Sequence, residues 1–224
     1  MVDPLAATVG GASVHLWPER ALSLPGEKTL LVADAHFGKA HTFRRLGVPV
    51  PEGSTQSNLQ RLDAVLARSG ARQVIFLGDL LHAPASQDSV TIDALRLWRV
   101  RHGQVSMVLV RGNHDLRAGD PPAELGIEVV DEPWDLGPWA LCHHPQAVKG
   151  RYALAGHVHP AVHVGRSRER LRLPCFHFGD QVGLLPAFGD FTGSHTLTPA
   201  PSDQVFVIAD DVVRAWPSRR AAAG

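Results

Sequence analysis

Residues 73–79 read QVIFLGD, a short apolar run that ends in glycine and aspartate. Two similar stretches lie on either side of it in the chain: TLLVADAH at residues 29–36 and VSMVLVRGNHD at residues 105–115. Apolar runs of this length, bounded by polar residues, are typical of buried strands. Residues 54–70 and 88–101 carry apolar side chains at helical spacing. Strand and helix thus alternate, which predicts βαβ units in a layered α/β domain.

The second half of the chain has a different pattern. Short apolar runs are separated by turn residues, with little helical periodicity between them, at residues 128–131, 139–142, 152–155, 161–164, 174–178 and 204–209. This pattern indicates a second sheet with more antiparallel pairing. Nearer the N-terminus we expect an edge strand at residues 14–17. Residues 37–53 are polar and rich in glycine and proline, which predicts a long irregular connection.

The composition is that of an ordinary globular protein. The chain has 224 residues, 44% of them apolar and 20% charged, which predicts one domain at residues 1–217 and a flexible tail at residues 218–224. Cys142 and Cys175 lie outside any Cys-x-x-Cys motif and are expected to be buried free thiols. The sequence shows no signal peptide and no apolar run of about 18 residues. We therefore expect a cytoplasmic protein without a membrane span.

The charge balance restricts the class of partner. Lysine and arginine number 22, and aspartate and glutamate also number 22, so the formal net charge is zero. A strongly basic protein that binds nucleic acid over a wide surface is therefore excluded, but a local basic patch is not.

Polar side chains follow five of the expected strands at the point where each strand ends. The segments are Asp34-Ala35-His36, Gly78-Asp79, Gly112-Asn113-His114-Asp115, His143-His144 and Gly156-His157-Val158-His159. In open α/β sheets, sites form beyond the carboxyl ends of the strands. We therefore expect these groups to converge in space.

The residue types in this set indicate a metal centre. Carboxylate, amide and imidazole groups suit Mn²⁺, Fe²⁺, Zn²⁺ or Mg²⁺, whereas a structural zinc site would need thiolates. The ligands are too many for one ordinary site, but they suit two metals that share a bridging carboxylate. Two such metals are the usual arrangement for displacement at phosphorus.

The motifs, in this order, resemble those of the calcineurin-like metallophosphoesterase superfamily. They span residues 34–159, and the combination is specific although each motif alone is weak. The resemblance implies an α/β (α+β) fold, a four-layer α-β-β-α sandwich with two mixed sheets. It also implies a hydrolase that acts on phosphoric esters.

The resemblance assigns a role to each matching residue. The implied metal ligands are Asp34, His36 and His159 for the first metal, Asn113, His143 and His157 for the second, and Asp79 for both. His114 would face the phosphate, stabilise the developing charge and protonate the leaving oxygen. Asp115 would orient His114 or cap the next segment. The nucleophile would be a metal-held hydroxide, because a metal lowers the pKa of bound water toward ~7.

A narrower resemblance covers nearly the whole chain. Residues 34–51 (DAHFGKAHTFRRLGVPVP), 78–82 (GDLLH), 143–145 (HHP), 156–160 (GHVHP) and 185–189 (LPAFG) are similar to the bacterial ligase-associated DNA damage response endonucleases. This similarity implies an Mn²⁺-dependent phosphodiesterase that acts on DNA in repair. It also implies functional association with a DNA ligase, a helicase and an exonuclease.

Further residues near the motifs are candidates for substrate binding. They are Lys39, His41, Arg44, Arg45, His82 and His144. The three cations among them either contact a phosphate backbone or belong to a solvated segment. His82 stands where many members of the superfamily carry a carboxylate. Arg166, Arg168, Arg170 and Arg172 alternate, so an extended strand would place them on one face, either along a nucleic-acid backbone or in solvent.

Other classes of function stay open from the sequence alone. A hydrolase of small nucleotides, pyrophosphates or phosphomonoesters would use the same metal centre. A scaffold that keeps the fold without the chemistry belongs to a different class, but it would need neither the complete ligand set nor His114. The physiological substrate, the choice between endonuclease and exonuclease, the metal used in the cell and the oligomeric state do not follow from the sequence.

Overall fold

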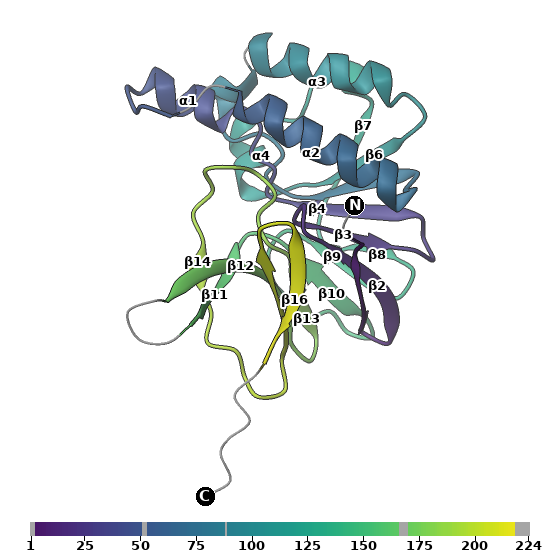
Figure 1. Cartoon of the computed structure of the whole chain (residues 1–224). Helices are drawn as coiled ribbons and strands as arrows, with labels where there is room; N and C mark the ends of the chain where they lie inside the picture. Colours follow the sequence, from purple (N-terminus) through teal and green to yellow (C-terminus); the bar gives the residue numbers. More distant parts are fainter. Residues whose placement is uncertain (1–2, 51–52, 88, 166–169, 218–224) are drawn as a thin grey trace, which may run out of the picture.

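The computed structural model describes residues 3–50, 53–87, 89–165 and 170–217 (Figure 1). The tail expected at residues 218–224 lies outside the described residues, as do Arg166 and Arg168. Two β-sheets pack face to face, and the helices lie together on one side of them.

The first sheet contains the strand and helix alternation that the sequence predicts. Its strands follow chain order: β1 (Leu5–Val9), β2 (Ala12–Trp17), β3 (Ala21–Leu24), β4 (Thr29–Ala33), β5 (Gln73–Leu77), β6 (Ser106–Val110) and β7 (Ile127–Val130). Strands β1 to β4 pair antiparallel, and β4 to β7 pair parallel. Helices α2 (Ser54–Ser69) and α3 (Ser89–Arg101) connect the parallel strands. The predicted βαβ units are therefore confirmed.

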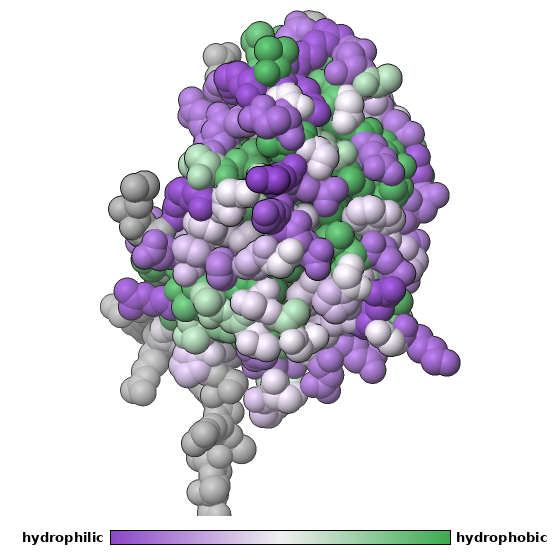
Figure 2. Space-filling model, turned by 90° about the vertical axis from the view of Figure 1, so that its right-hand side faces the viewer, coloured by the Kyte–Doolittle hydropathy of each residue, from purple (hydrophilic) through white to green (hydrophobic). Residues whose placement is uncertain are grey.

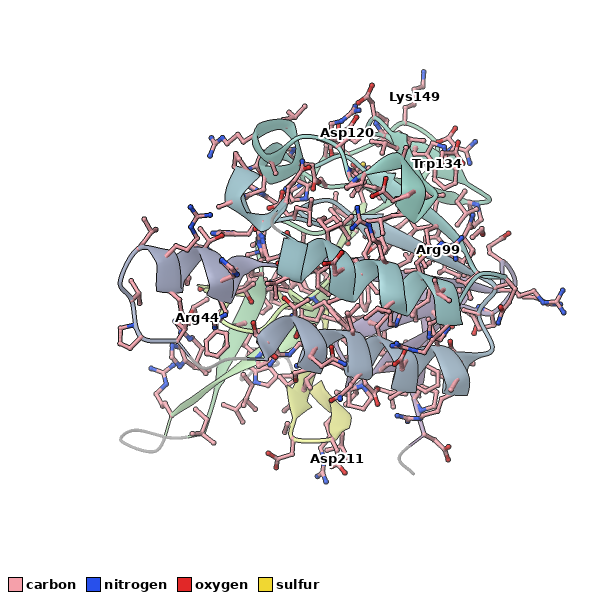
Figure 3. The ribbon with its side chains drawn as sticks, turned by 90° about the horizontal axis from the view of Figure 1, so that it is seen from above. Arg44, Arg99, Asp120, Trp134, Lys149 and Asp211 are labelled. Carbon is pink, nitrogen blue, oxygen red and sulfur yellow. The ribbon has the colours of Figure 1, made fainter. Side chains whose placement is uncertain are left out.

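Side chains of the first sheet alternate between two apolar cores. In β5, Val74 and Phe76 belong to the core under the helices, whereas Ile75 and Leu77 belong to the core between the sheets. Both faces are covered, which explains why the strand is apolar throughout. Helices α2 and α3 lie side by side over this sheet (Figure 3).

The second sheet is built from the second half of the chain. Its strands are β8 (Trp134–Leu136), β9 (Trp139–Cys142), β10 (Tyr152–Ala155), β11 (Pro160–Val164), β12 (Leu171–Phe178), β13 (Val182–Leu184), β14 (His195–Thr196), β15 (Gln204–Ala209) and β16 (Val212–Trp216). The order is β14-β11-β12-β13-β10-β9-β8, with β15 beside β12 and β16 beside β15. Parallel and antiparallel pairs both occur, so both sheets are mixed, as expected. The core between the sheets draws on both halves of the chain.

The outer helical layer of the expected four-layer sandwich does not occur among the described residues. The remaining helices are α1 (Lys39–Arg45), the 3₁₀ turns η1 (Pro84–Gln87) and η2 (Ala123–Leu125), and α4 (Asn113–Ala118). All end by Leu125, and the sequence beyond that residue lacks helical periodicity. Chain between the strands packs on the second sheet instead, where Leu197 contacts two small apolar clusters, one containing Cys175 and the other containing Cys142. The described part is thus an α-β-β sandwich.

Two local predictions were wrong. Residues 14–17 do not form an edge strand, because β2 pairs with β3 on one side and with β1 on the other. Residues 37–53 are not irregular throughout, because α1 begins after Gly38, whose φ of 81° starts the turn. Arg44 and Arg45 in the last turn of α1 stabilise it through the helix dipole. Glycine and proline are concentrated after this helix, not in it.

The surface is that of a chain that buries its apolar cores. On the face shown in Figure 2, hydrophilic residues predominate and apolar residues are scattered among them. Among the described residues, no helix is long and apolar enough to cross a membrane.

Removal of side-chain volume between the sheets should destabilise the protein. Ile75 is fully buried there, so Ile75→Ala should lower the free energy of unfolding by about 2–5 kcal/mol, measured by urea denaturation. Leu97→Ala on α3 is the control, because Leu97 is 65% exposed and its loss should change stability by less than about 0.5 kcal/mol. Equal losses of stability in the two variants would contradict the assignment of Ile75 to the core between the sheets.

Candidate metal centre

The sheet geometry brings the predicted motifs together. In the first sheet, Ala33 pairs with Leu77 and Leu77 with Val110, so β4, β5 and β6 end side by side. In the second sheet, Cys142 pairs with Ala155, so β9 and β10 also end together. The motif residues follow directly after these five strands. Because the sheets pack face to face, the two sets of strand ends meet.

The backbone at this meeting point is strained. Asp34, His36, Asp79, His157 and His159 all have positive φ values, between 46° and 66°. Such conformations cost about 1–3 kcal/mol each for residues other than glycine, and they persist only where surrounding contacts enforce them. Two of these contacts are hydrogen bonds from the His36 N–H to the Asp79 carbonyl (2.9 Å) and from the His157 N–H to Asp34 Oδ2 (2.9 Å). The strain turns these side chains toward one another.

The Asp79 carboxylate lies at the centre of the site and is 2% exposed. Its Oδ1 accepts a hydrogen bond from the His114 backbone N–H (2.9 Å) and lies 3.5 Å from His143 Nε2. Its Oδ2 lies 3.8 Å from His36 Nε2. One carboxylate therefore faces histidines of two different groups.

The first group consists of Asp34, His36 and His159, whose ligand atoms lie within 4.8 Å of one another. His159 Nε2 is 3.3 Å from Asp34 Oδ1 but forms no hydrogen bond with it. His36 Nδ1 is also buried without a hydrogen-bond partner. Buried polar atoms without partners are costly, and a cation held by these three side chains would give a partner to His159 Nε2.

The second group consists of Asn113, His143 and His157. His143 Nδ1 lies 3.0 Å from the Leu77 carbonyl, and because a carbonyl only accepts, Nδ1 carries the proton. His143 Nε2 therefore presents a lone pair, 3.0 Å from Asn113 Oδ1 and 3.1 Å from His157 Nδ1. Convergence of these atoms is the arrangement expected of metal ligands.

The charges of the site also fit divalent cations. Asp34 and Asp79 are buried, and buried carboxylates require compensation by positive charge. Burial lowers the pKa of His36 far below its ordinary value, with a contribution from the charge of Lys39, so its imidazole is neutral as a metal ligand must be. Burial also lowers the pKa of His157. For His159, burial is outweighed by Asp34, which raises its pKa. A metal bound here would polarise a phosphoryl oxygen and acidify a bound water.

Three glycines of the motifs lie where a candidate ligand approaches the backbone too closely to leave room for a side chain. A Cβ at Gly78 would lie 2.1 Å from His143 Nδ1, and one at Gly112 would lie 2.5 Å from Asp79 Oδ1. A Cβ at Gly156 would lie 2.7 Å from Asp34 Oδ2. Any side chain at these positions would displace a candidate ligand.

The two predicted catalytic residues have different surroundings. The His114 ring is fixed because its Nδ1 donates to the His82 carbonyl (2.6 Å), which leaves Nε2 4.0 Å from Asp79 Oδ2. Asp115 is almost fully buried and accepts backbone N–H groups of Asp79 (2.7 Å), Leu80 (2.9 Å) and Gly112 (2.8 Å). Burial raises its pKa to about 6 in spite of these bonds. Of the two roles expected for Asp115, the contacts show the cap: its carboxylate caps α4 and also positions the loop that carries Asp79, and none of these hydrogen bonds is to the His114 ring.

One positioning residue was missed by the sequence analysis. Glu132 Oε2 accepts the backbone N–H groups of His143 (2.7 Å) and His144 (2.8 Å), and Oε1 pairs with His144 Nδ1 (2.6 Å). These contacts hold the loop after β9 in place. No motif marks Glu132, since it lies in a different loop from the histidines that it holds.

Three of the predicted substrate-binding residues lie at the centre. The charges of Asp34 and Asp79 act on Lys39, although burial lowers its pKa overall. The His82 ring stacks on His114 at 5.0 Å, and burial lowers its pKa to about 4. The His144 ring lies 4.5 Å from that of His157.

The other three lie on α1 and extend outward from the centre. His41 and Arg44 are half-buried, and Arg45 is exposed. Arg44 lies on α1 at one side of the molecule (Figure 3). The role of these three residues in binding stays a prediction.

Comparison with known protein families confirms the superfamily. Residues 27–203, which include every motif, match the calcineurin-like phosphoesterase model. The chain therefore belongs to this family, and it is a metal-dependent hydrolase that acts on phosphoester bonds. A comparison with curated proteins finds no match.

Among solved structures, the chain is similar to the crystal structure of Pseudomonas putida nuclease MPE. The two are 43% identical with a TM-score of 0.86, and the match covers 96% of this chain and 100% of that one. The Escherichia coli phosphoesterase Yfce matches at 17% identity and a TM-score of 0.39, over 83% of this chain and 90% of that one. The first match agrees with the narrower resemblance found in the sequence.

The close contact between Gly78 and the His143 ring can be tested by adding one methyl group at residue 78. Gly78→Ala should remove most of the bound metal, measured by elemental analysis, because its Cβ would overlap His143. Gly70→Ala, at the end of α2, is a matched control, because Gly70 also has a positive φ (63°, against 74° for Gly78) but faces open space. The control should lose about 1 kcal/mol of stability and keep its metal. Full metal content in Gly78→Ala would contradict the assigned geometry.

Proposed function

We propose that this protein is an Mn²⁺-dependent phosphodiesterase with a dinuclear metal centre, and that it acts as a DNA endonuclease in DNA repair. The observation that carries the proposal is the position of Asp79, between Asp34, His36 and His159 on one side and Asn113, His143 and His157 on the other. Each group would supply three ligands to one metal, and the Asp79 carboxylate would be shared by both.

His114 has the geometry of the acid that assists the reaction. Its Nδ1 is held by the His82 carbonyl, so Nε2 is directed toward the side of Asp79 on which His36 lies. A protonated Nε2 there would stabilise negative charge on a phosphoryl oxygen and give its proton to the leaving oxygen. Such assistance contributes typically 10²–10⁴-fold to the rate.

The substrate class is supported by two observations. The chain shares 43% identity over nearly its full length with a protein named as a nuclease. Helix α1 places Lys39, Arg44 and Arg45 on one element that starts at the metal centre, which suits contact with a phosphate backbone. The donor set of carboxylate, amide and imidazole suits Mn²⁺.

The cellular part of the proposal rests on the resemblance to the ligase-associated endonucleases. We propose that the protein acts in the cytoplasm beside a DNA ligase, a helicase and an exonuclease. Zn²⁺, Fe²⁺ or Mg²⁺ would fit the same ligands and are tested together with Mn²⁺.

The first test compares bis(p-nitrophenyl) phosphate with p-nitrophenyl phosphate, with each of the four metals or with chelator. We expect Mn²⁺-dependent hydrolysis with preference for the diester, followed by cleavage of circular single-stranded DNA, which only an endonuclease can open. Preference for the monoester would overturn the phosphodiesterase proposal in favour of a phosphatase. Metal binding without hydrolysis of any substrate would favour a scaffold.

A second test distinguishes the role of His114 in the reaction from the role of Asp79 in metal binding. His114→Ala should lower kcat by about 10²–10⁴-fold and keep its metal, because only the backbone of His114 contacts Asp79 closely. Asp79→Asn should lose both metals. His163→Ala on β11 is the control, since His163 is exposed outside the site. Two full metal equivalents in Asp79→Asn would exclude the bridge, and metal loss in His114→Ala would exclude the assigned role.

A further inference from the structure

A second pocket adjoins the metal centre and shares the His159 ring with it. The pocket has a volume of about 160 Å³ and is lined by Arg20, His159, Arg172, Thr192, Gly193 and Ser194, among others. His159 Nδ1 faces the carbonyl of Gly193 at 3.1 Å, while its Nε2 faces Asp34. One imidazole therefore separates the two spaces. The volume is well above the roughly 10–15 Å³ that holds one water, so a phosphate group can enter.

The pocket has an excess of positive charge. Arg20 is half-buried in the turn between β2 and β3, and among the described residues its guanidinium forms no ion pair or hydrogen bond. The nearby carboxylate of Asp190 is already paired with Arg61 at 2.6 Å. Burial and the charge of Arg61 lower the pKa of Arg20. Arginine stays protonated in proteins. The carboxylate of Asp190 acts on the charge of Arg20 but is shared with Arg61, so two guanidinium groups face one carboxylate.

Arg172 supplies a second cation from the other sheet. It lies on β12, opposite His163 of β11, and is exposed. Within the described residues its guanidinium has no carboxylate partner either. Arg172 is the last of the alternating arginines in the sequence, and it lies at the wall of this pocket. Two guanidinium groups from different sheets thus line one space next to the metal centre.

We propose that this pocket binds a phosphate of a nucleic-acid strand next to the one that is cleaved, with Arg20 and Arg172 as its ligands. Guanidinium groups match phosphate geometry and form charge-assisted hydrogen bonds with it. A simple monoester or diester carries only the phosphate that is cleaved and would leave the pocket empty. The inference rests on the proposed function, because it specifies how a polynucleotide is recognised at the same site.

The test measures what one additional phosphate contributes to binding. Titration calorimetry compares thymidine dinucleotides with and without a terminal phosphate, at the 5′ or the 3′ end, on the Mn²⁺-loaded protein. The His114→Ala background prevents cleavage during the titration. We expect a terminal phosphate at one of the two ends to lower Kd about tenfold.

Variants of the two arginines test whether the pocket causes the lower Kd that a terminal phosphate gives. In Arg20→Gln and in Arg172→Gln, each combined with His114→Ala, the gain should fall to about twofold or less. Arg214→Gln on β16 removes one exposed charge elsewhere and should keep the full gain. If Arg20 had a structural role its loss would lower the melting temperature, whereas removal of a half-buried charge should leave the melting temperature unchanged or raise it.

Two results would overturn the proposal. A terminal phosphate that lowers Kd at neither end would show that no such pocket operates. A gain that survives in both arginine variants would place the terminal phosphate elsewhere, for example on the metals. Failure of the proposed function is a separate outcome, because it appears as intact DNA in the cleavage assay, while the dinucleotide comparison still decides the pocket.

Discussion

Two buried carboxylates, Asp34 and Asp79, impose the constraint that the surrounding structure has to meet. Their burial is unfavourable unless positive charge or hydrogen-bond donors surround them. The fold supplies donors through backbone N–H groups of His114 and His157. Imidazole groups complete the surroundings, and a bound cation would give a partner to the buried Nε2 of His159 as well as to the carboxylates. Metal binding and the stability of this region are therefore linked.

The need to bring charged ligands together also explains two features of the site that would normally lower stability. Positive φ values at five candidate ligands, and glycines that allow side chains to approach within van der Waals distance, are unfavourable for an isolated chain. Asp115 and Glu132 compensate for part of this cost. Each uses its carboxylate to bind several backbone N–H groups, and each thereby fixes a loop that carries candidate ligands. Acidic residues thus have two functions here, as ligands and as anchors of the backbone.

The distribution of positive charge complements this acidic centre. The net charge is zero, so the molecule offers no general attraction for a polyanion. Instead, Lys39 lies beside the buried carboxylates, and Arg20 and Arg172 line the adjoining pocket. Charge placed at the site favours a substrate whose phosphates reach both spaces at once. Under the proposed function, the His159 ring would lie between the pocket that binds one phosphate and the metal centre that hydrolyses the next.

The sequence by itself determined the βαβ units, the mixed second sheet, the family and the set of candidate ligands. It could do so because apolar periodicity and the groups after each strand are local properties of the chain. It did not determine that Asp115 would anchor the loop of Asp79, 36 residues away, or that Asp34 would accept the N–H of His157, 123 residues away. It also missed Glu132, the helix α1, the inner position of β2 and the pocket of Arg20 and Arg172. These features depend on which distant segments pack together, and only the tertiary structure decides that, because burial and the choice of hydrogen-bond partner arise when the two sheets meet.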